Sequence, residues 1–448
     1  MLKSLRTERQ AMELGRAQRI FLLVLVSAGS SIIYTPMYLK SVFYEPLMEA
    51  LDSTNADLGM MLSAYAITAT ICYLPSGIVA DKVRVRTLSW VGFTTTALLT
   101  YVYAMLPSIT TLMFVFVGMG ITSILIWWGI RFKLVRLISE GDEYSKNIGV
   151  SYGIYGAAGL IVGLINMWII NIFMDNMKMA VTTLLIVLGT IILILGILSF
   201  FFIPRFKGEV NKGESNFDLS VLKQVWKSPV IWMSAATMFF VYFFYTGVTY
   251  TTPYLSSVMG ASLAVVSLVS IVRHYGVTLL SGPIFGFLAK RVGSASQVIW
   301  IGSIVSALGF LSFLILPAGP AVAVVAAIIV IALGFIANGV FGIVSSQLTE
   351  GKVPISIFGT ATGILSVIGF LPDTFSSTWF GAMIDNQGND AYTGIFIILA
   401  ISAVLAAASA GVLLQYVKRN GEKLAAAEAQ AAVEALAAAK ALDLVSED

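Results

Sequence analysis

Residues 77–86, which read GIVADKVRVR, contain the end of one long apolar stretch, 58–80, and the short charged break that separates it from the next, 87–106. About 20 apolar residues is the length that an α-helix needs to cross the hydrocarbon core of a bilayer. Because these runs are continuous and do not alternate with polar residues, they predict helices and not the strands of a membrane barrel. The same pattern recurs along the chain, and the predicted spans are 18–39, 58–80, 87–106, 110–134, 147–174, 179–203, 229–252, 262–288, 297–316, 320–346, 355–383 and 391–416.

The composition excludes most soluble classes of protein. Hydrophobic residues make up 58% of the 448 residues and charged residues 11%, against about 45–50% and 25% in soluble proteins. The mean hydropathy is +0.89. A cytosolic enzyme, a nucleic-acid binder and a disordered scaffold are therefore excluded. One cysteine, Cys72, rules out a disulfide framework, and with a single histidine it leaves no metal site of the usual kind.

The basic residues between the spans predict the orientation of the chain. If there are twelve spans, only Lys40 and Lys178 lie on one side, so both termini are predicted to be cytoplasmic by the positive-inside rule. Arg131 is expected to reach the cytoplasmic interface and to set topology. The basic start of the chain and the many spans disfavour a cleaved signal peptide. The basic residues on the cytoplasmic side are Lys3, Arg6, Arg9, Arg16, Arg19, Lys82, Arg84, Arg86, Arg131, Lys133, Arg136, Lys146, Arg205, Lys207, Lys212, Lys223 and Lys227.

The polar stretch 204–228 divides the chain into two sets of six spans that look related. Sliding the fifth span onto the eleventh without a gap places Asp175-Asn176 on Asp385-Asn386 and superposes three pairs of glycines. Two such halves are typical of a transporter that rocks around a central site. The predicted parts are a cytoplasmic N-terminus (1–17), a six-helix bundle (18–203), a cytoplasmic linker (204–228), a second six-helix bundle (229–416) and an alanine-rich, helical cytoplasmic tail (417–448).

The break at 77–86 resembles the signature loop of the major facilitator superfamily, Gly-x-Leu-Ala-Asp-Arg-x-Gly-Arg-Arg. It departs from that pattern where Arg84 replaces a glycine and Val85 an arginine, and residues 286–293 form a decayed copy in the second half. The resemblance covers nearly the whole chain. It implies an all-α integral membrane fold of twelve transmembrane helices in two six-helix bundles. The matching positions are Gly77, Ala80, Asp81, Lys82 and Arg86.

The resemblance also implies that this loop is a cytoplasmic gate. Asp81 would join the nearby cations Lys82 and Arg86 in a latch that holds the two halves together in the outward-open state. Gly77 would permit a close approach between helices. The alternative is that the cations only set the topology.

Arg273, its neighbour His274 and Asp373 are ionisable residues inside predicted spans. An arginine at a helix centre costs at least about 2.5–3.5 kcal/mol on insertion scales, so another group must offset that cost. Arg273 and Asp373 both lie about halfway along their spans, near the bilayer midplane. In the superfamily these spans border the central cavity, so the two residues could meet. Pro372 should bend the eleventh span beside Asp373.

Two interpretations of these charges stay open. In one, Arg273 and Asp373 are a neutralised pair that only holds two helices in register. In the other, which we favour, Arg273 binds a substrate carboxylate or phosphate through its planar fork. Protonation of Asp373 would then free Arg273 and couple proton entry to anion binding. His274 either joins this relay or is a packing group, and Tyr245 and Asn338 are further substrate ligands, polar groups near mid-span.

The sequence thus predicts a secondary transporter of the inner membrane that works by alternating access on a small polar solute. We expect an organic anion as the substrate, coupling to protons, and a monomer that contacts no nucleic acid. The alternatives are an exporter of amphipathic or neutral compounds and, from another class, a non-transporting membrane receptor. No phosphate loop, nucleophile triad or metal cluster occurs, so we expect neither an enzyme nor a cofactor.

Overall fold

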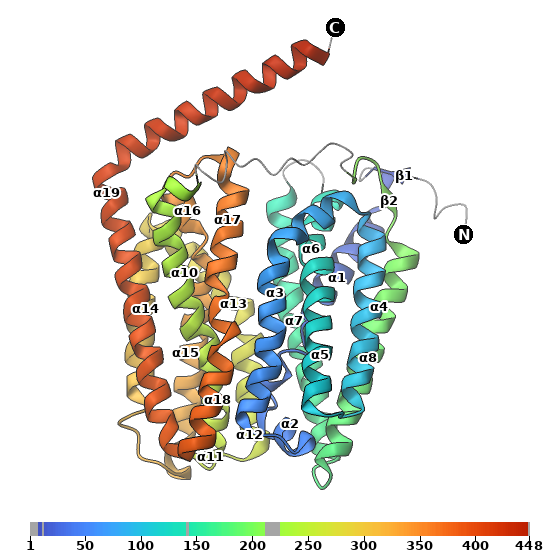
Figure 1. Cartoon of the computed structure of the whole chain (residues 1–448), viewed down its shortest axis with the longest axis vertical. Helices are drawn as coiled ribbons and strands as arrows, with labels where there is room; N and C mark the ends of the chain where they lie inside the picture. The colour runs from blue at the N-terminus through green and yellow to red at the C-terminus, as the bar shows by residue number, and fades with distance from the viewer. Residues whose placement is uncertain (1–7, 11–12, 140–142, 211–224, 447–448) are drawn as a thin grey trace.

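The computed structural model describes residues 8–10, 13–139, 143–210 and 225–446. Long helices run side by side between two ends of the molecule (Figure 1). Within the described ranges, the strands are β1 (Glu8–Arg9) and β2 (Arg205–Phe206), which pair in parallel. Much of the predicted linker, with Lys212 and Lys223, and the early cations Lys3 and Arg6 lie outside the described residues.

In the first half, helix α3 (Asn55–Lys82) begins with a capping box. The Thr54 side chain accepts a hydrogen bond from the Asp57 backbone N–H, and the Asp57 carboxylate accepts one from the Thr54 N–H, which satisfies donors that a helix start leaves free. The helices of this half are α1 (Arg16–Ile32), η2 (Leu39–Ser41), α2 (Tyr44–Leu51), α3 (Asn55–Lys82), α4 (Val85–Ala104), α5 (Ile109–Gly120), η3 (Ile121–Trp128), α6 (Gly129–Ile138), α7 (Glu143–Ile172) and α8 (Met177–Phe202).

The second half contains more interrupted helices than the first. Two of its spans are broken near their centres, by the π-helical turn η5 and by the 3-10 turn η7. Its helices are α10 (Pro229–Gly247), η4 (Val248–Tyr250), α11 (Thr251–Ser257), α12 (Leu263–Ile271), η5 (Val272–Gly276), α13 (Thr278–Val292), α14 (Ala295–Ser312), η6 (Pro320–Val322), α15 (Ala323–Ile343), α16 (Ser346–Glu350), α17 (Ile355–Gly369), η7 (Leu371–Thr374), α18 (Ser376–Gln387), η8 (Gly388–Asp390) and α19 (Ala391–Ser446).

Every predicted span coincides with a helix or with a short series of helices. In the described ranges, seven helices are long and apolar enough to cross a membrane, or nine if each of two bent pairs counts as one span. The total of twelve therefore stays a prediction. The predicted tail helix is present as the continuation of α19 beyond residue 416.

Buried hydrophobic side chains form one large cluster in each half. The first draws its members from residues 14–206, and the second from residues 238–410. Ile271 and Tyr275 of the second half pack into the first cluster, because α7 presents glycines there. A Cβ added to Gly159 would lie 2.1 Å from the Tyr275 ring, so this contact requires glycine.

The two ends of the bundle differ in how the halves meet. We call the end at which α3 is followed by α4 the motif end, and the end that holds α2 and α11 the far end (top and bottom of Figure 1). At the far end α3 and α18 approach closely. A Cβ on Gly59 would lie 2.4 Å from the backbone oxygen of Ser377, and one on Gly381 would lie 2.4 Å from that of Asn55.

Hydrogen bonds between the halves reinforce this far-end contact. The Asp385 carboxylate, on α18, accepts from the backbone N–H of Asn55 at 3.0 Å, from its side-chain amide at 2.7 Å and from the backbone N–H of Ala56 at 2.8 Å. An acid at the first turn of a helix meets free N–H groups and the positive end of the helix dipole. The hydroxyl groups of Ser63 and Thr378 lie 2.9 Å apart a little deeper.

Candidate functional site

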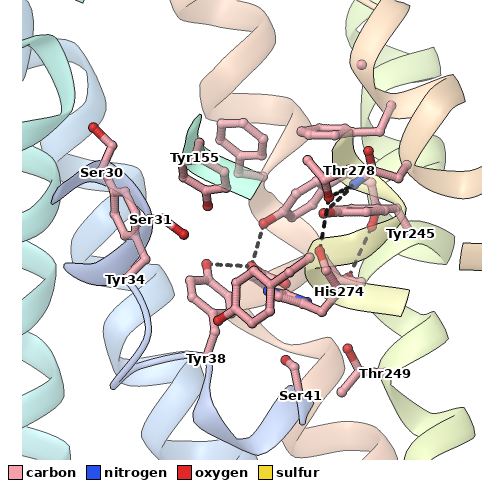
Figure 2. Close-up of a pocket in the computed structure, with 18 of the residues that line it drawn as sticks. Ser30, Ser31, Tyr34, Tyr38, Ser41, Tyr155, Tyr245, Thr249, His274 and Thr278 are labelled. Carbon is pink, nitrogen blue, oxygen red and sulfur yellow. Dashed lines mark hydrogen bonds between the residues drawn. The ribbon is translucent and has the colours of Figure 1, made fainter. Parts of the chain in front are cut away.

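A cavity of about 810 Å³ lies between the two halves. Tyr34 and Tyr38 border it from the first half, and Tyr245 and His274 from the second (Figure 2). The five residues predicted to bind the substrate or the proton all line this cavity. They are Arg273, His274, Tyr245, Asn338 and Asp373.

Asp373 owes its position to a break in the eleventh span. Pro372 has no backbone N–H to continue an α-helix, and the chain forms the 3-10 turn η7 between α17 and α18. Asp373 is buried, with 4% of its surface exposed. Its Oδ2 atom accepts a hydrogen bond from the Tyr242 hydroxyl at 2.6 Å and one from the Tyr38 hydroxyl at 3.4 Å.

Arg273 lies on the π-helical turn η5, where the Val277 N–H reaches back to the Val272 carbonyl at 2.8 Å. Such turns are rare in proteins as a whole, but many of those that occur lie at functional sites. The side chain passes over Gly334, where a Cβ would lie 2.6 Å from its Cγ. Its Nη2 donates to the backbone oxygen of Ser41 at 2.6 Å. Among the described residues, no acceptor pairs with its buried Nε.

The expectation that Arg273 and Asp373 meet is wrong in this structure. No ion pair joins them in the part of the chain that the structure describes. The physical reason is the turn η2, which brings the Ser41 carbonyl within reach of the guanidinium. Tyrosine hydroxyls hold Asp373 instead.

Lys40 is a cavity residue that the sequence-based prediction missed. It lines the cavity and is buried, with 5% of its surface exposed. Its Nζ lies 5.8 Å from the centre of the Tyr250 ring and finds no hydrogen-bond acceptor among the described residues. Its position in the sequence could have indicated this role, because Lys40 lies at the end of the first span, on the side of the membrane that is predicted to hold almost no cations.

Arg131 also differs from its prediction. We expected it at the membrane interface, but it lines the same cavity. The π-helical turn η3 directly precedes α6, on which it lies. A straight α-helix, which the sequence-based prediction assumed, would point this side chain differently.

Tyr245 and Asn338 hydrogen-bond to each other. The Asn338 amide donates to the Tyr245 hydroxyl at 3.3 Å and to the Thr278 hydroxyl at 3.3 Å, and its oxygen accepts from Ser281 at 2.7 Å. The amide of Asn338 is thus largely satisfied within the protein. The His274 ring lies edge-on to that of Tyr275, with 4.7 Å between the centres.

The signature residues do not line the cavity. Gly77 has no close neighbour in this conformation, because an added Cβ would meet no atom within 4 Å, and the close approach expected of it in the latched state stays a prediction. Arg86 donates from Nε to the Ile203 carbonyl at 2.5 Å. The latch role of Asp81 and Lys82 stays a prediction.

The neighbouring Arg84 ties three segments of the first half together. Its guanidinium contacts Glu8 at 2.6 Å and Glu209 at 3.1 Å. This places β1, β2 and the signature loop in one cluster at the motif end. As for metals, no group of three His, Cys, Asp or Glu side chains that could hold an ion occurs in the described ranges.

Comparisons with known proteins identify the family. The Major Facilitator Superfamily profile matches residues 20–377. The chain belongs to this superfamily. Inner membrane protein YqcE of Escherichia coli (strain K12) is 28% identical over 363 residues, covering 80% of this chain and 85% of the relative. Inner membrane protein YihN of the same strain is 24% identical over 416 residues, covering 92% and 98%.

Solved structures agree on the fold. A bacterial homologue of the human lysosomal transporter Spinster, in an inward-facing and unoccupied conformation, has a TM-score of 0.70 at 13% identity, covering 89% of this chain and 98% of that one. The nucleoside transporter NupG has a TM-score of 0.66 at 16% identity, covering 89% and 99%. This superfamily member is therefore a multi-pass inner-membrane protein of the secondary-transporter class, whose members are generally not enzymes.

Proposed function

We propose that this superfamily member carries a small organic anion across the inner membrane by alternating access, coupled to protons. The observation that supports the anion is a pair of buried cations, Arg273 and Lys40, which both line the cavity. Neither forms an ion pair with a carboxylate among the described residues.

Both cations have donors left for a ligand. The Nε of Arg273 and the Nζ of Lys40 are buried and lack an acceptor in the described part of the protein. A buried charge without a partner is costly, and a bound anion offsets that cost. A carboxylate or phosphate also fits the geometry of a guanidinium fork.

The position of Asp373 supports coupling to protons. An ionised Asp373 places a negative charge in the cavity that Lys40 and Arg273 also line. In a cavity of low dielectric constant this charge opposes a substrate anion strongly. Protonation removes it, so that a proton and the anion enter together and leave together.

The closed far end supports alternating access. The far-end bonds of Asp385 and the close approach of α3 to α18 shut that end of the bundle. By the positive-inside rule the motif end faces the cytoplasm. The conformation is then inward-facing, and the cavity receives or releases its substrate on the cytoplasmic side.

The aromatic wall favours a second candidate, transport of a neutral or amphipathic compound. Aromatic side chains provide broad apolar contact together with a polar edge. The tyrosines and tryptophans of the wall are Tyr34, Tyr38, Tyr65, Tyr73, Trp127, Trp128, Tyr152, Tyr155, Tyr242, Tyr245, Tyr250 and Tyr275.

The test is thermal stabilisation of the purified protein by panels of organic acids, sugars and cationic drugs. We expect acids to stabilise it, and Arg273→Ala and Lys40→Ala each to weaken acid binding about tenfold or more, as expected for a charge-assisted hydrogen bond. Lys178→Ala, an exposed lysine outside the cavity, is the matched control. Stabilisation by neutral compounds alone, or unchanged acid binding in both variants, would overturn the anion proposal.

A further inference from the structure

A third cation of the cavity lies on the opposite half from Arg273. Arg131 of α6 lines the cavity, whereas Lys133 and Arg136 on the same helix do not. Its guanidinium carbon lies 4.2 Å from the centre of the Tyr152 ring and 5.1 Å from that of Tyr155. Stacking on aromatic faces holds an arginine fork in a fixed plane.

Hydrogen bonds fix one edge of this fork and leave another free. Arg131 Nε donates to the Ser151 hydroxyl at 3.3 Å, and Ser151 accepts from the Ser27 hydroxyl at 2.7 Å. Arg131 Nη2 is buried without an acceptor among the described residues. In the same ranges no carboxylate forms an ion pair with it. Side chains of α7 therefore orient Arg131 directly, and Ser27 of α1 does so through Ser151. A residue that only set topology would not need these contacts.

We propose that Arg131 is a second anion site and that the substrate is an organic dianion whose two acidic groups bridge the halves. This inference rests on the proposed function. One acidic group would bind Arg131 of the first half, and the other would bind Arg273 of the second half together with Lys40 of η2, at the far-end side of the cavity. The cavity is large enough for such a molecule, at about 810 Å³.

The charge balance of the cavity favours a dianion over a monoanion. Three cations line the cavity, Lys40, Arg131 and Arg273, and with His274 neutral and Asp373 protonated, as the proposed coupling requires when the anion enters, their formal charge is +3. A dianion reduces this to +1, whereas a monoanion leaves +2.

The test compares matched ligands that differ in one charge, namely a dicarboxylic acid series and the half-amides of the same acids. Binding to the purified full chain is measured by calorimetry. We expect the wild type to prefer the dianion about tenfold or more, and Arg131→Gln to remove that preference while it binds the half-amide as before. Arg136→Gln, an exposed cation five residues further along α6, should behave like the wild type.

The outcomes separate this proposal from the proposed function. An equal loss of both ligands in Arg131→Gln, or an unchanged preference, would overturn the dianion site while Arg273-dependent acid binding stands. Acid binding that needs neither Arg273 nor Lys40 would overturn both. If Arg131→Gln does not fold, Arg131→Lys replaces it, because lysine keeps the charge and loses the fork. The proposal then requires a weaker dianion preference with half-amide binding retained.

Discussion

At the scale of single residues, Asp373 has an unusual position for a carboxylate. Within the described wall of the cavity it is the one acidic side chain, among three cations. Two tyrosine hydroxyls donate to the same oxygen, Oδ2. The proposed coupling assigns the transported proton to this carboxylate.

The variant Asp373→Asn should separate accumulation from exchange. Asparagine cannot take up a proton, so the variant should no longer accumulate substrate in proteoliposomes under an imposed pH gradient. Exchange of internal for external substrate should continue, because Arg273 and Lys40 remain. Uphill accumulation by the variant would show that another group carries the proton.

The residues also show how far the sequence could predict the site. Arg273 and Asp373 were found because a charge in the middle of an apolar span is costly and therefore needs a partner or a ligand. Lys40 was missed and Arg131 was given a topological role, because both lie near the ends of their spans, where charges are ordinary. Only the turns η2 and η3, which no hydrophobic pattern encodes, direct them into the cavity.

At the scale of elements, the contact between α3 and α18 depends on glycine. The atoms nearest to a Cβ on Gly59 are the backbone oxygen and carbon of Ser377 and the Cα of Thr378, at 2.4, 2.6 and 2.7 Å. Backbone atoms cannot turn aside as a side chain can. The two helices must therefore separate if this position carries any side chain.

The variant Gly59→Ala should open the far end. Overpacking costs about 1–3 kcal/mol, which shifts an equilibrium between two conformations roughly 5- to 150-fold. The measurement is the distance between spin labels at Glu49→Cys and Gln387→Cys, exposed far-end positions of the two halves, in a Cys72→Ala background. Gly153→Ala on α7 is the control, because its Cβ meets no neighbour, and an equal response of the two variants would contradict the prediction.

The far-end helix α2 should make this closure sensitive to pH. Glu45 accepts a hydrogen bond from the Ser256 hydroxyl of the other half, and burial raises the pKa of its carboxyl above the ordinary value. Opening the far end would expose Glu45 to water and return its pKa toward that value. The closed form therefore binds the proton more tightly and gains stability as the pH falls through the raised pKa.

Acidification should accordingly shorten the far-end spin-label distance. The experiment uses the same labels in an Asp373→Asn background, so that the cavity carboxylate does not contribute. Glu45→Gln should make the distance insensitive to pH over that range. A pH response that persists in Glu45→Gln would assign it to another group.

At the scale of the whole molecule, the sequence predicted the fold more completely than the site. Many hydrophobic runs and many cations support the predicted fold independently. An error in the interpretation of one of them therefore does not alter the predicted architecture. The conformation could not be predicted in this way, because hydrophobic runs and the distribution of cations do not indicate which end of the bundle is closed. The contacts of Asp385 and of Ser63 with Thr378 show that the far end is closed in this structure.

A disulfide across the far end should therefore stop transport reversibly. The hydroxyls of Ser63 and Thr378 lie 2.9 Å apart on α3 and α18, so the double variant Ser63→Cys, Thr378→Cys in a Cys72→Ala background is placed to form one. Oxidation should reduce uptake to the level of empty proteoliposomes, and reduction should restore it, because alternating access requires this contact to break.

The control is a disulfide within one half. The Thr96 and Thr122 hydroxyls of the first half lie 2.8 Å apart, and Thr96→Cys, Thr122→Cys should leave uptake close to that of its reduced form. Mass spectrometry of the free thiols measures how completely each bridge forms. Full uptake with the α3–α18 bridge closed would mean that substrate crosses without separation of the two halves at the far end, and the alternating-access mechanism proposed here would be wrong.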